Sequence, residues 1–158
     1  MGKPQNGAID PLEIEPRTGT GYPEPYRQNV MARAKRVLGD AFGLTRYGVN
    51  LVELPPGTWS SQRHWHTHED EFIYVVSGEL TLITGEGEQL LTPRMVAGFP
   101  AGDANGHHLI NNSETVAAYL EIGDRNDEDE VFYPDIDLLY KVNDDGEHEF
   151  TNRDGLPY

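Results

Sequence analysis

The sequence of 158 residues contains no cysteine. This absence excludes disulfide bonds, thiolate zinc sites, iron–sulfur clusters and cysteine nucleophiles. Long apolar runs are missing as well, since no stretch approaches the roughly 18 apolar residues that a membrane span needs. The N-terminal residues also lack the apolar segment of a secretory signal peptide. We therefore expect a soluble, cytoplasmic protein.

Basic residues are scarce. The chain has 12 Lys and Arg against 27 Asp and Glu, which gives a formal net charge of −15. Such a surface repels phosphate backbones and anionic lipids, so nucleic acid and membranes are excluded as partners and a small-molecule ligand is expected. Much of the negative charge lies between Asp124 and Asp137, which we interpret as a solvated face.

The chain divides into three parts that differ in composition and in the pattern of their apolar residues. Residues 1–43 form an arm and lead-in: 1–28 predict an extended segment that is partly disordered unless docked, and 30–38 have helical character that Gly39 and Gly43 end. Residues 44–122 carry short apolar runs separated by turn residues. Residues 123–158 form an acidic loop and a C-terminal extension, in which 133–140 predict one more strand. This extension is expected to pack either along the main domain or against a second subunit.

The central part predicts an all-β fold. Short apolar runs with Gly, Pro and Asn between them are typical of a β-sandwich or barrel, and no helical segment separates them. The runs are 49–54, 72–76, 80–84, 89–91, 96–99, 107–110 and 116–122.

Three histidines alternate in the segment that follows the first run. In a strand, His64, His66 and His68 lie on one face. A hairpin through residues 67–70 then returns the chain, so that Glu71 opens the next strand beside them, while Glu69 is expected to be exposed. Imidazoles and a carboxylate on one face make a transition-metal site, and a later pair, His107 and His108, can complete it.

These residues resemble the two signatures of the cupin superfamily. The first signature is G-x5-H-x-H-x(3,4)-E-x6-G, and here its first gap is one residue longer. The second is G-x5-P-x-G-x2-H-x3-N, and here Arg94 replaces the first glycine and the gap before the histidine is two residues longer. The matching residues are Gly57, His64, His66, Glu71 and Gly78, then Pro100, Gly102, His107 and Asn111. The wider pattern is similar to small bacterial single-domain cupins, some of them called sugar-phosphate isomerases.

The resemblance implies a jelly-roll β-barrel, also called a double-stranded β-helix, that holds one divalent metal ion. Its ligands would be His64, His66, Glu71 and His107. Two alternatives stay open: His108 in place of His107, and the pair His66 and His68 in place of His64 and His66. The metal would be Fe, Mn, Ni, Cu or Zn, because the ligand set has nitrogen and oxygen but no thiolate.

Three functions fit such a site. The first is a metal-dependent isomerase, epimerase or dioxygenase acting on a small oxygenated molecule, with His68 as the acid–base residue. The second is a non-catalytic binding or sensing protein, and the third is a barrel that has lost its metal. Arg63 should point away from the histidines, which argues against a phosphate-bearing substrate. A homodimer is expected, because a partner protects exposed strand edges.

Overall fold

The computed structural model describes residues 7–143 and 145–158, and it is built almost entirely of antiparallel strands. In the described part of the chain, no helix is long and apolar enough to cross a membrane. The helices are short: η1 (Pro11–Glu13), η2 (Gln28–Val30) and α1 (Leu38–Ala41). The strands are β1 (Arg17–Thr18), β2 (Ala34–Val37), β3 (Tyr47–Leu54), β4 (Trp65–His66), β5 (Glu71–Ser77), β6 (Leu80–Thr84), β7 (Gly87–Leu91), β8 (Val96–Phe99), β9 (His108–Ile110), β10 (Ala117–Asp124), β11 (Val131–Tyr133), β12 (Leu138–Val142) and β13 (His148–Thr151).

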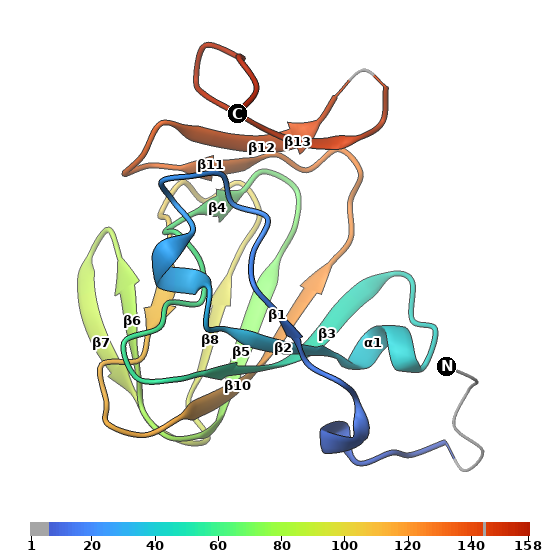
Figure 1. The fold of residues 1–158 in the computed structure, drawn as a ribbon, viewed down its shortest axis with the longest axis vertical. Coiled ribbons are helices and arrows are strands. Elements are labelled where there is room, and N and C mark those ends of the chain that lie inside the picture. The colour runs from blue at the N-terminus through green and yellow to red at the C-terminus, as the bar shows by residue number, and fades with distance from the viewer. Residues whose placement is uncertain (1–6, 144) are drawn as a thin grey trace.

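The strands form three sheets (Figure 1). The six-stranded sheet has the order β1-β2-β3-β10-β5-β8, the three-stranded sheet β7-β6-β9, and the four-stranded sheet β13-β12-β11-β4. The main core includes Val52, Val75, Leu80, Leu109 and Tyr119, which come from the six-stranded and three-stranded sheets and are at most 3% exposed. This arrangement is a jelly-roll barrel, and the predicted all-β cupin fold is confirmed.

Strand β5 shows why these residues fold this way. Ile73 and Val75 are buried, and Phe72, Tyr74 and Val76 alternate with them on the exposed face. The period of two matches a strand, and the β-branched residues favour it. Gly78 ends the strand with φ of 72°, and a Cβ there would lie 2.7 Å from the backbone of Ala117. Only glycine fits this turn.

The predicted helix over 30–38 is wrong. Residues 34–37 form strand β2, which pairs with the free edge of β3 from Ala34 opposite Glu53 to Val37 opposite Asn50. Pairing with this edge overrides the weak helical propensity of the segment. Only one helical turn, α1, follows it, and the turn includes Gly39. The described part of the arm is docked, with Tyr22 and Val30 buried in a second apolar cluster.

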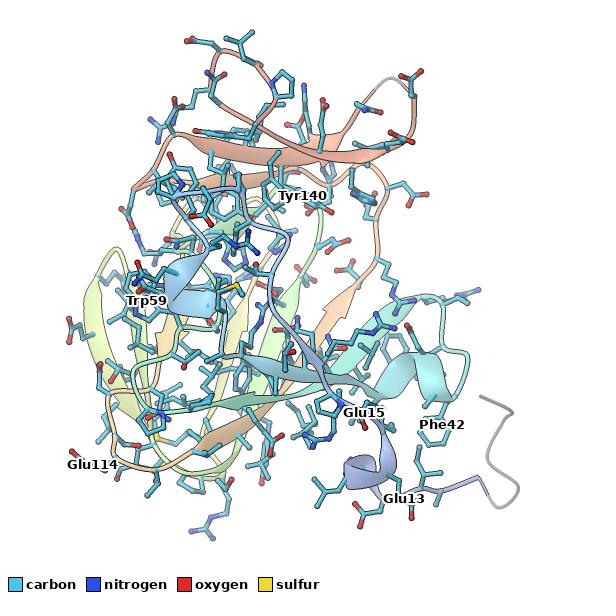
Figure 2. All side chains as sticks on the ribbon, viewed as in Figure 1. Glu13, Glu15, Phe42, Trp59, Glu114 and Tyr140 are labelled. Atoms are coloured by element: carbon cyan, nitrogen blue, oxygen red, sulfur yellow. The ribbon has the colours of Figure 1, made fainter. Side chains whose placement is uncertain are left out.

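The C-terminal extension packs along the barrel, which was one of the two alternatives. The single strand predicted over 133–140 is wrong, because the chain turns after Tyr133 and forms the hairpin of β11 and β12. Pro134 explains the break, since proline cannot donate to a sheet ladder. β11 also pairs with β4, which carries His66. In Figure 2, Tyr140 lies where this sheet meets the rest of the molecule.

Candidate metal centre

The four predicted ligands lie together inside the barrel. A single carboxylate oxygen of Glu71, Oε2, is 2.7 Å from Nε2 of His107, 3.4 Å from Nε2 of His64 and 3.5 Å from Nε2 of His66. The four side chains are 8–18% exposed. Three imidazole nitrogens thus surround one carboxylate oxygen. The ligand atoms of His64, His66 and Glu71 lie within 4.8 Å of one another and could hold a metal ion, and His107 lies beside them.

Short pieces of strand place these side chains. His64 and His107 face each other in an isolated antiparallel bridge, in which each backbone N–H donates to the other residue's carbonyl oxygen at 2.8–3.1 Å. His66 follows on β4, two residues after His64 and therefore on the same face. Glu71 is the first residue of β5, as predicted. The hairpin predicted through residues 67–70 is wrong, because β4 pairs with β11 whereas β5 pairs with β10 and β8 in another sheet.

The structure separates the alternatives. The ring of His108 points to the other side of its strand, where Nδ1 lies 3.0 Å from the carbonyl oxygen of Ser61 and the ring meets Trp59 edge to face. The geometry therefore favours His107. His68 does not join the cluster: β4 ends at His66, so the strict alternation stops before it. His68 is exposed, with Nδ1 2.8 Å from Thr67 Oγ1.

The hydrogen bonds made by the Nδ1 atoms show whether the imidazole rings are oriented to bind a metal. His66 donates from Nδ1 to Asp129 Oδ2 at 2.6 Å, and Nδ1 of His64 lies 2.9 Å from the carbonyl oxygen of Gln62. These bonds leave Nε2 of both rings free to bind a cation. The ring of His107 stacks on Phe99, with centroids 3.5 Å apart and planes within 1°. Because the rings are held with Nε2 toward Glu71, the residues fit a bound divalent ion.

Burial and charge oppose each other at the centre. Burial raises the pKa of Glu71, but hydrogen bonds from His107, His64 and His66 outweigh it and hold this pKa well below the usual range. Burial lowers the pKa of His66, but Asp129 and Glu71 outweigh it and raise this pKa to about 10. Burial lowers the pKa of His107. Without an ion, the carboxylate charge of Glu71 is balanced by the proton that His66 keeps, and a metal would replace this proton.

Sequence reasoning missed Asp129. It lies in the acidic stretch that was interpreted as solvated, yet its carboxylate is only 6% exposed. It accepts from His66 and from the backbone N–H of His68 and Glu69. Nothing in the sequence distinguishes it from its acidic neighbours, because its partner lies more than 60 residues away.

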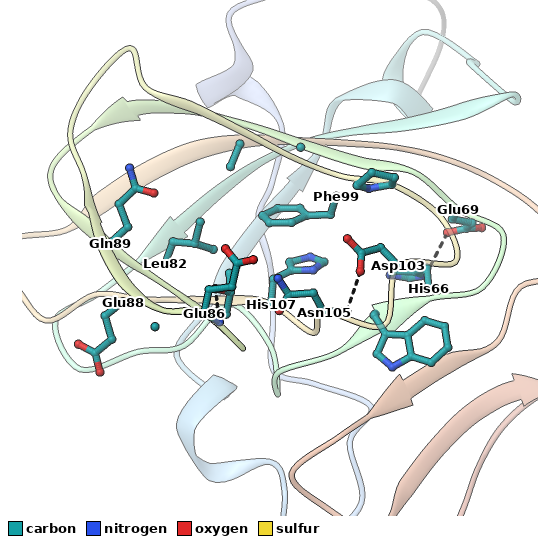
Figure 3. Close-up of a pocket in the computed structure, with 16 residues that line it drawn as sticks. His66, Glu69, Leu82, Glu86, Glu88, Gln89, Phe99, Asp103, Asn105 and His107 are labelled. Atoms are coloured by element: carbon teal, nitrogen blue, oxygen red, sulfur yellow. Dashed lines mark hydrogen bonds and ion pairs between the residues drawn. The ribbon is translucent and has the colours of Figure 1, made fainter.

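Two cavities of about 470 Å³ each adjoin the cluster. The acidic cavity is lined by carboxylates, namely Glu69, Glu86, Glu88 and Asp103, beside Phe99 and His107 (Figure 3). The tyrosine cavity is lined by hydroxyls and cations, namely Tyr22, Tyr119, Tyr133, Tyr140, Arg33 and Lys35. Both cavities reach His66, Glu69, Phe99 and His107. The cluster is thus accessible from two sides.

Two features of these cavities differ from the sequence expectation. Glu69 is half-buried and lines both cavities instead of being exposed. Cations do line a cavity beside the centre, but they are Arg33 and Lys35 and do not come from the segment around the histidines. Arg63, as expected, points elsewhere and pairs with Asp135 at 2.6 Å. Distant sheet pairing, which brings β2 alongside the barrel, places Arg33 and Lys35 there.

Comparison with known proteins agrees with the fold. The family model for the cupin domain matches residues 50–123. A cupin-superfamily sugar phosphate isomerase from Silicibacter pomeroyi is 40% identical, with a TM-score of 0.90 over 96% of each chain. A protein from Acidithiobacillus ferrooxidans, provisionally named a sugar phosphate isomerase, is 32% identical, with a TM-score of 0.72 over 80% of each chain. The chain belongs to the cupin family.

More distant structures show the fold alone. The polyketide cyclase RemF from Streptomyces resistomycificus is 17% identical, with a TM-score of 0.60 over 74% of this chain and 78% of its own. No curated protein matches the sequence.

Proposed function

We propose that this protein binds one divalent transition-metal ion through His64, His66, Glu71 and His107, and that it isomerises a small sugar phosphate or a similar oxygenated molecule. The observation that carries the proposal is the convergence of three Nε2 atoms on one carboxylate oxygen of Glu71. The names of the two similar structures support the reaction class, and the adjoining cavities offer room for a substrate of this size.

The bound metal would act as a Lewis acid that polarises an oxygen of the substrate. Its nitrogen and oxygen ligands suit Fe, Mn, Ni, Cu or Zn. The remaining chemistry belongs to side chains of the cavities. An aldose–ketose isomerisation moves one proton from C2 to C1 and a second from the C2 hydroxyl to the C1 oxygen, which leaves the formula unchanged. One residue that takes the carbon-bound proton and returns it carries the first transfer, and the second passes between the two oxygens through solvent or the same residue.

Glu69 is our candidate for this proton transfer, in place of the exposed His68. Its side chain lines both cavities, and the Asn126 N–H donates to its Oε1 at 2.8 Å. Burial raises the pKa of Glu69, and nearby Asp129 adds to the effect. A carboxyl group with a raised pKa is a better base and a better acid near neutral pH than an exposed one.

A non-catalytic binding protein is the second candidate. It is favoured by one observation, that the histidine predicted as acid–base residue lies outside both cavities. The two functions share the metal site and differ only in turnover, since a binder saturates without forming product.

Deuterium exchange separates the two candidates. The metal-loaded protein is incubated with a panel of aldose phosphates in D2O, and deuterium at C1 of the ketose formed and at C2 of the recovered aldose is followed by NMR. We expect exchange in the wild type, loss of exchange with retained metal in Glu69→Gln, and unchanged exchange in Glu86→Gln, which alters an acid on the far wall of the acidic cavity. A protein that holds its metal but exchanges no substrate hydrogen would contradict the isomerase and support the binder.

A further inference from the structure

Arg33 is a cation that lines the tyrosine cavity without forming an ion pair with a described residue. Its Nη1 donates to the carbonyl oxygen of Ser60, but its buried Nε has no hydrogen-bond partner, and no ion pair forms between Arg33 and a described carboxylate. The two neighbouring cations differ, because Lys35 pairs with Glu121 at 2.7 Å and Arg36 pairs with Glu53. A buried guanidinium N–H without an acceptor is costly, so the position of Arg33 Nε calls for an anionic partner.

Tyr119 places a second unpaired donor in the same cavity. It is 1% exposed, and its hydroxyl lacks a hydrogen-bond partner among the described residues. The nearby Ser60 lowers the pKa of Tyr119, yet no hydrogen bond of normal geometry joins the two hydroxyls. Burial raises this pKa well above its usual value, so the hydroxyl keeps its proton and can donate. Arg33 and Tyr119 both line the tyrosine cavity, so both donors belong to one cavity wall.

The nearby acid does not satisfy these donors. Glu121 lines the cavity, but its Oε1 already accepts from Lys35 Nζ at 2.7 Å and from Asn50 Nδ2 at 3.0 Å. Two donors with no acceptor between them are complementary to an oxyanion, which offers several lone pairs and a negative charge. Phosphate and carboxylate groups both have this chemistry.

We propose that Arg33 and Tyr119 form an oxyanion subsite in the tyrosine cavity, which holds the phosphate or carboxylate group of a substrate whose other end reaches the His64, His66, Glu71 and His107 cluster. The inference rests on the proposed function and narrows its substrate to an anionic one. Lys35 flanks the subsite and remains paired with Glu121. The arrangement would fix the orientation of the substrate, because one end is recognised by charge and the other by the metal centre.

Binding of three matched probes tests the subsite. Ribose 5-phosphate, ribonate and neutral ribose are titrated into metal-loaded protein by calorimetry, and metal content is measured on every sample. We expect the wild type to bind at least one of the anions tenfold or more tightly than ribose, since a charge-assisted hydrogen bond contributes a factor of about this size. Which anion binds more tightly distinguishes phosphate from carboxylate.

Variants then test whether Arg33 and Tyr119 cause the preference for anions over ribose. Arg33→Gln and Tyr119→Phe should lose most of it while ribose affinity and metal content stay unchanged, and Arg36→Gln, on the same chain segment but outside the cavity, should retain it. Wild-type protein that binds ribose as tightly as both anions, or an Arg33→Gln variant that keeps the preference, would overturn the subsite and leave the metal proposal intact. Absence of metal from every sample would instead overturn the proposed function.

Discussion

His66 Nδ1 lies 2.6 Å from the Asp129 carboxylate, and this bond links a predicted metal ligand to the C-terminal part of the chain. The carboxylate accepts from the ring and from two backbone N–H groups, so it is itself held in place. A ring fixed in this way presents only Nε2 to the centre. Asp129 therefore acts as a positioning residue for His66.

Removing the charge of Asp129 should weaken metal binding without abolishing it. We expect Asp129→Asn to lower the affinity for the metal about 10- to 100-fold, because the ring loses both its orientation and its basicity. The affinity is measured by competition with a chromophoric chelator. Asp127→Asn, an exposed acid in the same loop, serves as the control and should bind like the wild type. Equal affinities for all three proteins would show that Asp129 has no positioning role.

The metal-free protein should keep a proton on His66 well above neutral pH. Its pKa of about 10 exceeds the unfolded value of about 6.5. The interaction therefore stabilises the fold fully below about pH 6.5, and its contribution is lost as pH rises toward 10. Metal must displace the proton, so metal affinity should increase with pH over this window. NMR titration of protein that has been stripped of metal with a chelator measures the pKa of His66 directly. A midpoint near pH 6.5 would contradict this prediction.

Gly78 offers a test of the fold that is independent of the metal. Gly78→Ala should destabilise the protein more than Gly57→Ala, since both residues have positive φ but only at Gly78 would a Cβ meet backbone, 2.7 Å from Ala117 Cα. Backbone strain alone costs about 1–2 kcal/mol, and the clash adds to it. Urea unfolding gives the two values, and equal destabilisation would show that the close contact relaxes freely.

We predict that two copies of the protein associate through the exposed face of β5 and β8. Phe72, Tyr74, Val76 and Val96 lie there and are 36–53% exposed. We expect a second copy to cover this face, because a two-fold pairing of one apolar patch on itself is the commonest way to bury it. Sedimentation should give a dimer for the wild type and a monomer for Tyr74→Glu. Leu90→Glu, an exposed change on β7, should remain dimeric. A monomeric wild type would rule out this homodimer.

The strands of the barrel could be predicted from the sequence because their signals are local. A short run of consecutive apolar residues, 72–76, marks β5, and turn residues bracket β6 at both ends. The histidines were predictable for the same reason, since His64, His66 and Glu71 lie within eight residues of one another. Local signals do not give the order of the strands in the sheets or the partner of each strand. The expectation of a jelly-roll arrangement came from the resemblance to cupins.

The rest depends on contacts between distant segments. Arg33 reaches the cavity only because β2 pairs with β3, and local propensity predicted a helix there. Asp129 reaches His66 only because β11 pairs with β4. Neither residue carries a local pattern that separates it from other surface charges, so no reading of spacing alone would have selected them. His68 shows the converse, because strict alternation predicted a position that the short strand β4 does not reach.

The central claim is that one divalent metal ion is held by the histidines and Glu71. The most direct test is the metal content of untagged protein purified without chelator, measured by plasma mass spectrometry beside His66→Ala and Glu71→Ala. The account predicts nearly one transition-metal ion per chain in the wild type and almost none in the two variants, while all three remain folded by circular dichroism. A wild-type protein that contains no metal and takes up none when Fe, Mn, Ni, Cu and Zn are supplied would contradict it.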